Sequence, residues 1–375
     1  MKKIFLILNL LSMLILAGCA GSGSSNVSSE NNQKSSENKL YIAAWYATYD
    51  AERGLQSFSN NIRLFNEINP VWYNLNPSYL NTGSPPFVAD LRNKPLILSL
   101  ARSNGVKVLP TIQNFGVSNF DPTVIHSIIN DPVARSGHVA EIVNLVVTEG
   151  YDGIDIDYEN LAANDCIAFS AFITELGYAL KQHQKLLSVT VYAKTSPGAT
   201  WDGPGAQDWA VLARSADTIK IMAYDYHWAS FHAGPISPID WLRDVLNYAD
   251  SIPDLKGKLI VGLPFYGLDW GIGTAKEVMY QDVSEILNRY APSNYNRYNT
   301  DHSANPICGY YSNNVELHFD YSLNGTSHTV YFQDVEATKK RLSLINQHRQ
   351  TVKGVTFWHL GGEDYRIWDE LGKYK

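Results

Sequence analysis

The chain has 375 residues, of which 45% are hydrophobic and 18% charged, and its 30 basic and 37 acidic residues give a net charge of −7. This composition is that of a globular protein and excludes a disordered or fibrous chain. An acidic chain without a basic run also argues against nucleic acid as a partner.

The first residues have the pattern of an export signal. Lys2 and Lys3 precede a mostly apolar stretch, Ile4–Ala17, that is too short to span a bilayer as a helix. The following Leu-Ala-Gly-Cys sequence, which ends at Cys19, resembles a bacterial lipobox at all four positions. We therefore predict a signal peptide over residues 1–18 and an exported protein held to a membrane of the cell envelope by a lipid on Cys19. A secretory cleavage site without lipid is the alternative.

Residues 19–39 are predicted to form a flexible tether. Serine, asparagine, glycine and glutamate dominate this segment and apolar residues are nearly absent, so it cannot bury a core. The folded domain is expected to cover residues 40–375. Cys166 and Cys308 can either pair or remain free thiols, and nothing in the sequence resembles a metal cluster.

From residue 40 onward, short apolar runs alternate with amphipathic stretches. The runs predict strands at 41–46, 71–75, 106–112, 153–158, 187–193, 218–224, 259–265 and 355–360. The stretches predict helices at 51–67, 89–104, 132–149, 165–184, 206–215, 238–251, 335–349 and 363–371. Strands that each lead into a helix predict an α/β fold of the (β/α)₈ TIM-barrel type. A doubly wound sheet is the alternative, but no glycine-rich phosphate loop follows the first strand.

One long connection, between residues 268 and 330, interrupts this alternation of strands and helices. Within it, Val315–Tyr321 alternates apolar and polar residues, Leu323–Thr326 offers a tight turn, and Thr329–Phe332 can return as a second strand. This pattern predicts a β-hairpin. We expect a small α+β insertion after the seventh barrel strand, above the barrel mouth.

The fourth predicted strand carries acidic residues at every second position. Asp155, Asp157 and Glu159 share one face at a spacing of about 6.6 Å, while isoleucine and tyrosine side chains take the other. In a barrel this alternation turns the carboxylates inward, where poor solvation and mutual repulsion raise pKa values. A protonated Glu159 at the C-terminal end of the strand is what a general acid requires. Acids satisfied by structural hydrogen bonds are the alternative.

These residues resemble a family signature. The sequence Asp-Gly-Ile-Asp-Ile-Asp-Tyr-Glu at 152–159 is similar to the Asp-Gly-x-Asp-x-Asp-x-Glu motif of family 18 glycoside hydrolases, the chitinase-like barrels. Met222–Tyr226 resembles the sixth strand of that family and Gly354–Trp358 its eighth strand, and an insertion after strand seven is also a family trait. The resemblance extends from about residue 40 to the end of the chain.

The resemblance implies retaining, substrate-assisted hydrolysis of β-1,4-linked N-acetylglucosaminides, without a metal or cofactor. It implies that Glu159 protonates the glycosidic oxygen while the acetamido oxygen of the substrate attacks the anomeric carbon. Asp157 would stabilise the resulting oxazolinium ion and Asp155 would tune Asp157. Tyr224 would donate a hydrogen bond to the acetamido oxygen, and Asp225 would hold the sugar or the acetamido group. A glycan that contains β-linked GlcNAc is then the expected partner.

The resemblance also implies that Trp358 forms the floor of the sugar site. Other aromatic and polar side chains near predicted strand ends are candidates for sugar contacts, with packing in the core or in loops as the alternative. These candidates are Trp45, Tyr46, Tyr73, Gln113, Tyr192, Tyr226 and Tyr266.

The third-strand segment Leu109–Phe115 departs from the Ser-x-Gly-Gly of many chitinases and resembles a branch of the family that includes spore-peptidoglycan glucosaminidases. His328–Asp334 resembles the same branch, except that Gln333 stands where that branch usually has glutamate. We expect Asp334 to cap a helix. Peptidoglycan and chitin-type glycans both remain open as substrates. A carbohydrate-binding lipoprotein without catalysis and a structural envelope protein are the alternative functions.

Overall fold

The computed structural model describes residues 39–81, 83–230, 232–290 and 316–375. The expected signal peptide, Cys19 and Cys308 lie outside these residues, so the lipid anchor and the cysteine pairing stay predictions. Cys166 begins a helix and is half-buried. One compact unit extends from Leu40 to Lys375.

An 11-stranded sheet runs in the order β4-β3-β6-β7-β8-β9-β10-β15-β1-β2-β5. The second barrel position is shared by β2 and β3 and the third by β5 and β6, while β4 pairs antiparallel with β3 outside the barrel. The parallel strands therefore fill the positions of a (β/α)₈ barrel, and the predicted fold is confirmed. The strands are β1 (Tyr41–Tyr46), β2 (Glu67–Pro70), β3 (Tyr73–Leu75), β4 (Phe87–Ala89), β5 (Lys107–Val108), β6 (Thr111–Gln113), β7 (Gly153–Asp157), β8 (Leu186–Tyr192), β9 (Thr218–Met222), β10 (Leu259–Pro264) and β15 (Val352–Trp358).

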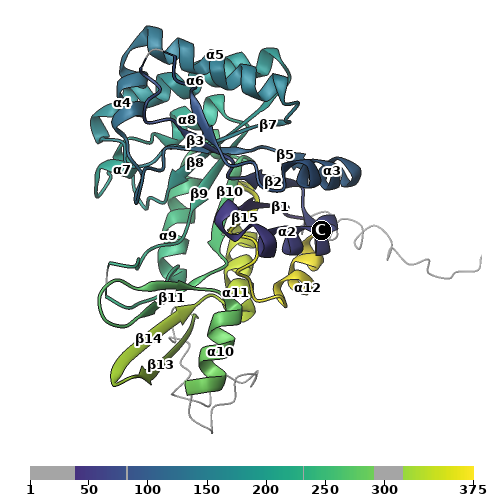
Figure 1. Cartoon of the computed structure of the whole chain (residues 1–375), viewed down its shortest axis with the longest axis vertical. Coiled ribbons are helices and arrows are strands. Elements are labelled where there is room, and N and C mark those ends of the chain that lie inside the picture. Colours follow the sequence, from purple (N-terminus) through teal and green to yellow (C-terminus); the bar gives the residue numbers. More distant parts are fainter. Residues whose placement is uncertain (1–38, 82, 231, 291–315) are drawn as a thin grey trace, which may run out of the picture. The chain divides into compact units, whose positions relative to one another are not determined.

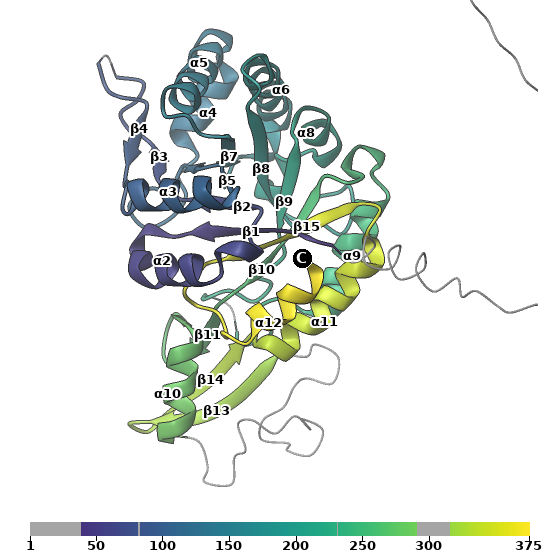
Figure 2. The ribbon, with the colours of Figure 1, turned by 90° about the vertical axis from the view of Figure 1, so that its right-hand side faces the viewer.

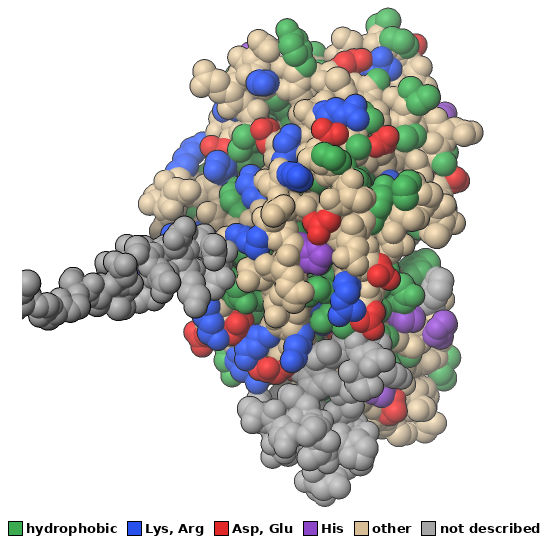
Figure 3. Space-filling model, turned by 180° about the vertical axis from the view of Figure 1, so that it is seen from behind, with side chains coloured by type: hydrophobic (Ala, Val, Ile, Leu, Met, Phe, Trp, Pro, Cys, Tyr) green, Lys and Arg blue, Asp and Glu red, His purple; other side chains and the backbone are tan. Residues whose placement is uncertain are grey.

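Helices surround these strands (Figure 1 and Figure 2). They are α2 (Ala51–Asn60), α3 (Lys94–Asn104), α4 (Thr123–Asn130), α5 (Pro132–Thr148), α6 (Cys166–Gln182), α7 (Asp202–Gly205), α8 (Trp209–Ser215), α9 (Ile239–Asp250), α11 (Val335–Ile345) and α12 (Ile367–Leu371). Ile154, Ile156 and Tyr158 of the fourth barrel strand are fully buried in the core. The outer surface is solvated, and Figure 3 shows basic and acidic side chains side by side over one face. Within the described residues, no helix has both the length and the apolar character that crossing a membrane requires.

Several predicted boundaries are wrong. The helix predicted at 51–67 ends at Asn60, and the second barrel strand begins at Glu67 rather than at residue 71, because Glu67 turns into the barrel and meets a buried cation there. The helix predicted at 89–104 begins at Lys94, since Ala89 pairs with Tyr73 across β3 and β4. Helix α4 lies in a segment for which the sequence pattern predicts no element.

The expected α+β insertion follows β10. Its strands are β11 (Gly267–Trp270), β12 (Lys276–Val278), β13 (Leu317–Leu323) and β14 (Thr326–Phe332), and α10 (Tyr280–Tyr290) packs against this antiparallel sheet. The predicted hairpin is confirmed, because Asn324 and Gly325 form its turn with φ of 52° and 80°. Asp334 caps α11 by accepting a hydrogen bond from the Ala337 N–H, as expected. The sheet and α10 lie at one end of the view in Figure 1.

Candidate active site

Strand β7 places the acidic row in the barrel interior. Its first residue must be glycine, because a Cβ at Gly153 would lie 2.2 Å from the Leu186 carbonyl oxygen of β8. Asp155 and Asp157 are 0% and 5% exposed, and Glu159 is half-buried two residues beyond the end of the strand. The structure therefore brings the predicted carboxyl groups onto one face.

Asp155 is surrounded by hydrogen-bond donors from four strands. Trp45 Nε1 lies 3.1 Å from Oδ2 and Thr111 Oγ1 lies 2.9 Å from the same oxygen. Lys220 Nζ lies 3.2 Å from Oδ1, and Thr190 Oγ1 lies 3.3 Å from both oxygens. These hydrogen bonds and the nearby cation hold the Asp155 carboxyl group in place at the base of the row.

Asp157 and Glu159 are acids of raised pKa. Burial, followed by the charges of Glu159 and Asp155, raises the pKa of Asp157 well above its usual range. Burial raises the pKa of Glu159 to about 7. A hydrogen bond with Tyr192 lowers this pKa, and the charge of Asp225 raises it. Oδ1 of Asp157 is buried without a hydrogen-bond partner among the described residues. Glu159 can therefore act as a proton donor near neutral pH.

Tyr224 and Asp225 follow β9 at the mouth of the barrel. Burial, followed by the charge of Asp157, raises the pKa of Tyr224 well above its usual range, so its hydroxyl remains a neutral donor. Tyr266 donates a hydrogen bond to Oδ1 of Asp225, and its ring meets the Tyr224 ring edge to face at 6.2 Å. Asp225 has φ of 57°, a left-handed conformation that Asp tolerates better than most residues.

Aromatic and polar side chains flank the acids. Trp358 ends β15 and meets Trp45 edge to face at 6.0 Å. Gln113 on β6 is in register with Asp157 on β7, and residues paired in this way point to the same face of a sheet. Tyr192 interacts with Glu159 and donates a hydrogen bond to Asn160 at 3.1 Å. The structure thus places most of the predicted sugar contacts around the acidic row.

Tyr46 and Tyr73 lie elsewhere. Tyr46 follows Trp45 on β1, and successive strand residues face opposite sides, so the Tyr46 ring turns outward. It is fully buried against α2, and Asn93 Nδ2 donates to its hydroxyl at 3.0 Å. Tyr73 is buried in the same core, with its hydroxyl 2.7 Å from that of Tyr151. Because neither side chain reaches the barrel mouth, the predicted sugar contacts are wrong for both.

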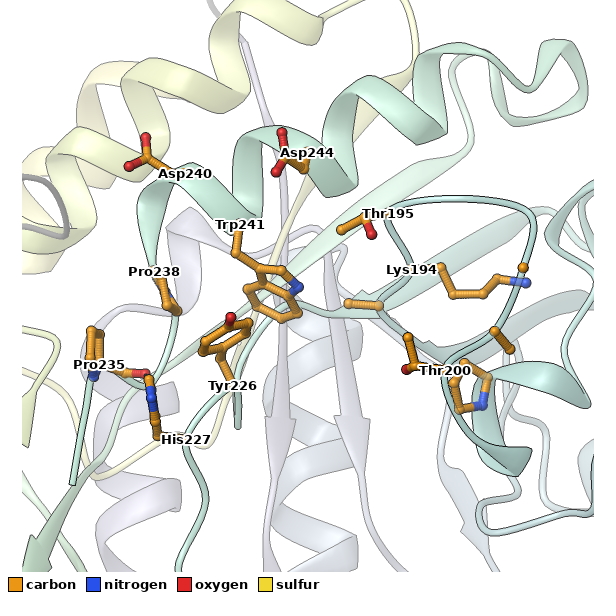
Figure 4. Close-up of a pocket in the computed structure, with 14 residues that line it drawn as sticks. Lys194, Thr195, Thr200, Tyr226, His227, Pro235, Pro238, Asp240, Trp241 and Asp244 are labelled. Atoms are coloured by element: carbon orange, nitrogen blue, oxygen red, sulfur yellow. The ribbon is translucent and has the colours of Figure 1, made fainter. Parts of the chain in front are cut away.

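Tyr226 lines a cavity outside strand β9. The cavity has a volume of about 650 Å³ and lies between the loops after β8 and β9 and the start of α9 (Figure 4). The Tyr226 ring, 48% exposed, lies 5.2 Å from the ring of Trp241. Lys194 and Thr200 line one side of the cavity, and Asp240 and Asp244 extend from α9. Tyr226 therefore lines this cavity, and its ring contacts are with His227 and Trp241.

The barrel interior also holds two charged residues that the sequence patterns did not predict. Lys220 is fully buried, and its Nζ lies 2.8 Å from Glu67 Oε1 as well as 3.2 Å from Asp155. Period-two alternation could have revealed Lys220, because it shares a strand face with Tyr224. No such signal exists for Glu67, which falls at the end of a predicted helix.

The arrangement combines a proton donor with a pKa of about 7, a second buried acid and a neutral phenol donor. At an acetal bond this set can protonate a leaving oxygen and stabilise the positive charge that develops as the bond breaks. The donors and acids stand at the C-terminal ends of parallel strands, where barrel enzymes carry their active sites.

Comparison with known proteins matches residues 40–364 to glycosyl hydrolases family 18. YdhD of Bacillus subtilis (strain 168), whose name describes it provisionally as a sporulation-specific glycosylase, is 30% identical over 281 residues, covering 73% of this chain and 62% of YdhD. The cortical fragment-lytic enzyme of Bacillus anthracis is 25% identical over 274 residues, covering 71% of this chain and 59% of the enzyme. This chain thus spans about 60% of the length of both relatives.

A solved structure shares the fold. The spore cortex-lytic enzyme SleL of Bacillus megaterium QM B1551 superposes with a TM-score of 0.76 over 90% of this chain and 74% of SleL, at 23% identity. This likeness concerns the fold alone, whereas the family match covers most of the sequence. The chain therefore belongs to family 18 of the glycosyl hydrolases.

Proposed function

We propose that this chain is a retaining, substrate-assisted hydrolase of β-1,4-linked N-acetylglucosaminides. The observation that carries the proposal is the row of Asp155, Asp157 and Glu159 on one face, in which Asp157 and Glu159 have a raised pKa and Lys220 contacts Asp155. Tyr224 lies close enough to Asp157 for the two groups to interact electrostatically.

The proposed reaction starts with Glu159, which gives its proton to the glycosidic oxygen. As the bond to the leaving sugar breaks, the acetamido oxygen of the substrate bonds to the anomeric carbon and an oxazolinium ion forms. Tyr224 donates a hydrogen bond to the acetamido group, and the unpartnered Oδ1 of Asp157 accepts its N–H. Water then attacks the anomeric carbon from the leaving-group side and gives a proton to Glu159, while the bond between that carbon and the acetamido oxygen breaks and restores the N-acetyl group. Configuration is therefore retained.

Among glycans, we favour peptidoglycan or its fragments over chitin-type oligosaccharides. Two relatives are named for lysis of spore cortex or its fragments, and Leu109–Phe115 resembles that branch. A lipid on Cys19 would also keep the enzyme close to the cell wall, since a flexible tether of about 20 residues has an r.m.s. span near 25 Å. We accordingly propose that the protein is a lipoprotein of the cell envelope.

Digestion of purified peptidoglycan and of chitotetraose by the Cys19→Ser protein tests the substrate. Mass spectrometry of the products should show new reducing ends at GlcNAc. An intact peptidoglycan beside rapid chitotetraose hydrolysis would reverse the preference, and hydrolysis of neither glycan would contradict the proposed activity.

A thiazoline analogue of GlcNAc tests the reaction path. The analogue copies the cyclic intermediate rather than the substrate, so it should inhibit competitively. A sugar trapped covalently on a carboxylate would contradict the proposed path.

A further inference from the structure

The cavity of about 650 Å³ that Tyr226 lines lies at the carboxyl ends of β8 and β9 (Figure 4). Ala193 and Lys194 directly follow β8, and Tyr226 follows β9. Because β8 pairs in parallel with β7, these loops leave the barrel at the same end as the segment that carries Glu159. The cavity and the proposed proton donor therefore share one end of the barrel.

The cavity combines an aromatic wall with carboxylates. The rings of Tyr226 and Trp241 meet at 5.2 Å, and both line the cavity. Asp240 and Asp244 extend from α9, the helix that also carries Trp241 (Figure 4). Asp240 pairs with Arg243, whereas Asp244 makes no hydrogen bond or ion pair with another described residue. One carboxylate at the cavity is thus free to bind a ligand.

Lys194 also lines the cavity, but its charge is engaged elsewhere. Its Nζ donates to the Gln207 carbonyl oxygen at 2.5 Å and stands 5.4 Å from the centre of the Trp209 ring. Figure 4 shows the Lys194 ammonium directed away from the rings of Tyr226 and Trp241. The α9 side of the cavity is therefore acidic, and Lys194 does not neutralise it.

These features suit a primary amine on a short chain. A carboxylate binds an ammonium through charge-assisted hydrogen bonds, and the face of an aromatic ring attracts the same cation. The volume falls within the range of about 300–1,000 Å³ that is typical of small-ligand sites, so a short peptide can enter. A neutral sugar would gain hydrogen bonds from Asp244 but no charge attraction.

We propose that this cavity binds the amino group of a peptide stem on the leaving sugar. The inference rests on the peptidoglycan hydrolysis proposed above. When such a glycan is cut after GlcNAc, the leaving sugar is N-acetylmuramic acid, and its lactyl ether is attached to the carbon next to the one that carries the leaving oxygen. The stem therefore starts within a few bonds of Glu159. Tyr192 interacts with Glu159, and the next residue, Ala193, lines the cavity. A diamino acid in the stem supplies the amine.

Three preparations of the same soluble glycan strands test this inference. The first keeps stems that end in a diamino acid, the second has lost its stems to an amidase, and the third has its free amines acetylated. We expect kcat/KM to be about two- to fivefold higher for the first than for the other two, because an exposed ion pair has an effect of that size. Equal values for all three preparations would overturn the inference.

Substitutions of Asp244 locate the effect. Asp244→Asn should lower the ratio of kcat/KM for intact strands to kcat/KM for stripped strands by about two- to fivefold. Asp244→Lys should lower this ratio further, because its ammonium repels the amine. Glu141→Gln and Glu141→Lys are matched controls, since Glu141 is also exposed on a helix but does not line the cavity. A ratio that is unchanged in the Asp244 variants, or that falls equally in the Glu141 variants, would overturn the inference.

Calorimetry measures binding apart from catalysis. The probes are a muramyl tripeptide that ends in lysine and the same compound acetylated on the lysine amine. The free amine should bind more tightly to the wild type, and Asp244→Asn should remove the difference. Equal binding of both probes to the wild type would overturn the inference. Hydrolysis of stripped strands without preference for stems contradicts only the role of the cavity, whereas hydrolysis of neither intact nor stripped strands contradicts the proposed function.

Discussion

Asn114 holds the backbone of Glu159 from two sides. Its Oδ1 accepts the Glu159 N–H at 2.8 Å, and its Nδ2 donates to the Glu159 carbonyl oxygen at 3.0 Å. The same amide group also donates to the Asp121 carbonyl oxygen at 3.0 Å. Glu159 lies beyond the end of β7 and is not held by the strand. The hydrogen bonds from Asn114 therefore fix the backbone position from which the Glu159 carboxyl group extends.

Replacement of Asn114 should therefore slow the reaction. Asn114→Ala should lower kcat by roughly 10- to 100-fold with a smaller change in KM, because a small displacement of the acid costs rate. The lost hydrogen bonds should also lower the free energy of unfolding by about 1–3 kcal/mol. Steady-state kinetics and thermal melting measure both effects. A folded variant with the kcat of the wild type would contradict the role of Asn114.

The alkaline limb of the pH profile should report Glu159. Because its pKa is raised to about 7 and the acid form is the active one, kcat/KM should fall as the pH rises through that value. The hydrogen bond with Tyr192 lowers the pKa of Glu159, so Tyr192→Phe should move the limb to higher pH. Kinetics between pH 4 and about 9 check this prediction. A limb that moves to lower pH in Tyr192→Phe would contradict it.

The substitutions Tyr46→Phe and Tyr266→Phe each remove one hydroxyl group, the first in the core and the second beside Asp225. Tyr46→Phe removes a buried hydroxyl that accepts a hydrogen bond from Asn93, so we expect a loss of about 1 kcal/mol in stability and an unchanged KM. Tyr266→Phe removes the donor to Asp225, so kcat/KM should fall by roughly tenfold, the value of a lost hydrogen bond to a charged group. A fall in kcat/KM for Tyr46→Phe, with none for Tyr266→Phe, would mean that these assignments are reversed.

Local patterns were enough to predict the barrel and its acidic row. The alternation of strands and helices predicts the fold, and the period of two along residues 154–159 predicts that Asp155, Asp157 and Glu159 share a face. The same period could have excluded Tyr46 once Trp45 was assigned to the interior. The insertion was predictable because Asn324-Gly325 is a strong turn signal.

Contacts between distant strands were beyond local patterns. The cluster of Glu67, Asp155 and Lys220 joins β2, β7 and β9, and its formation depends on the register of the closed barrel. A helical pattern that runs through residue 67 hides the strand that carries Glu67. Tyr73 was equally hidden, because the core contact between its hydroxyl and that of Tyr151 joins separate elements.

Membrane attachment is a further prediction. If Cys19 carries a lipid, Cys19→Ser should appear in the soluble fraction, because the tether offers no second apolar anchor. Metabolic labelling with a fatty acid and fractionation of the wild type and the variant measure this. A Cys19→Ser protein that is processed and still sediments with membranes would contradict the lipoprotein assignment.

Participation of the substrate acetamido group is the central claim, and one series of substrates tests it directly. Chromogenic chito-oligosaccharides whose N-acetyl group carries none, one, two or three fluorine atoms differ in the nucleophilicity of the acetamido oxygen. If that oxygen attacks the anomeric carbon, kcat/KM should fall steeply with each fluorine, because electron withdrawal weakens the nucleophile. Rates that stay level across the series would contradict substrate assistance.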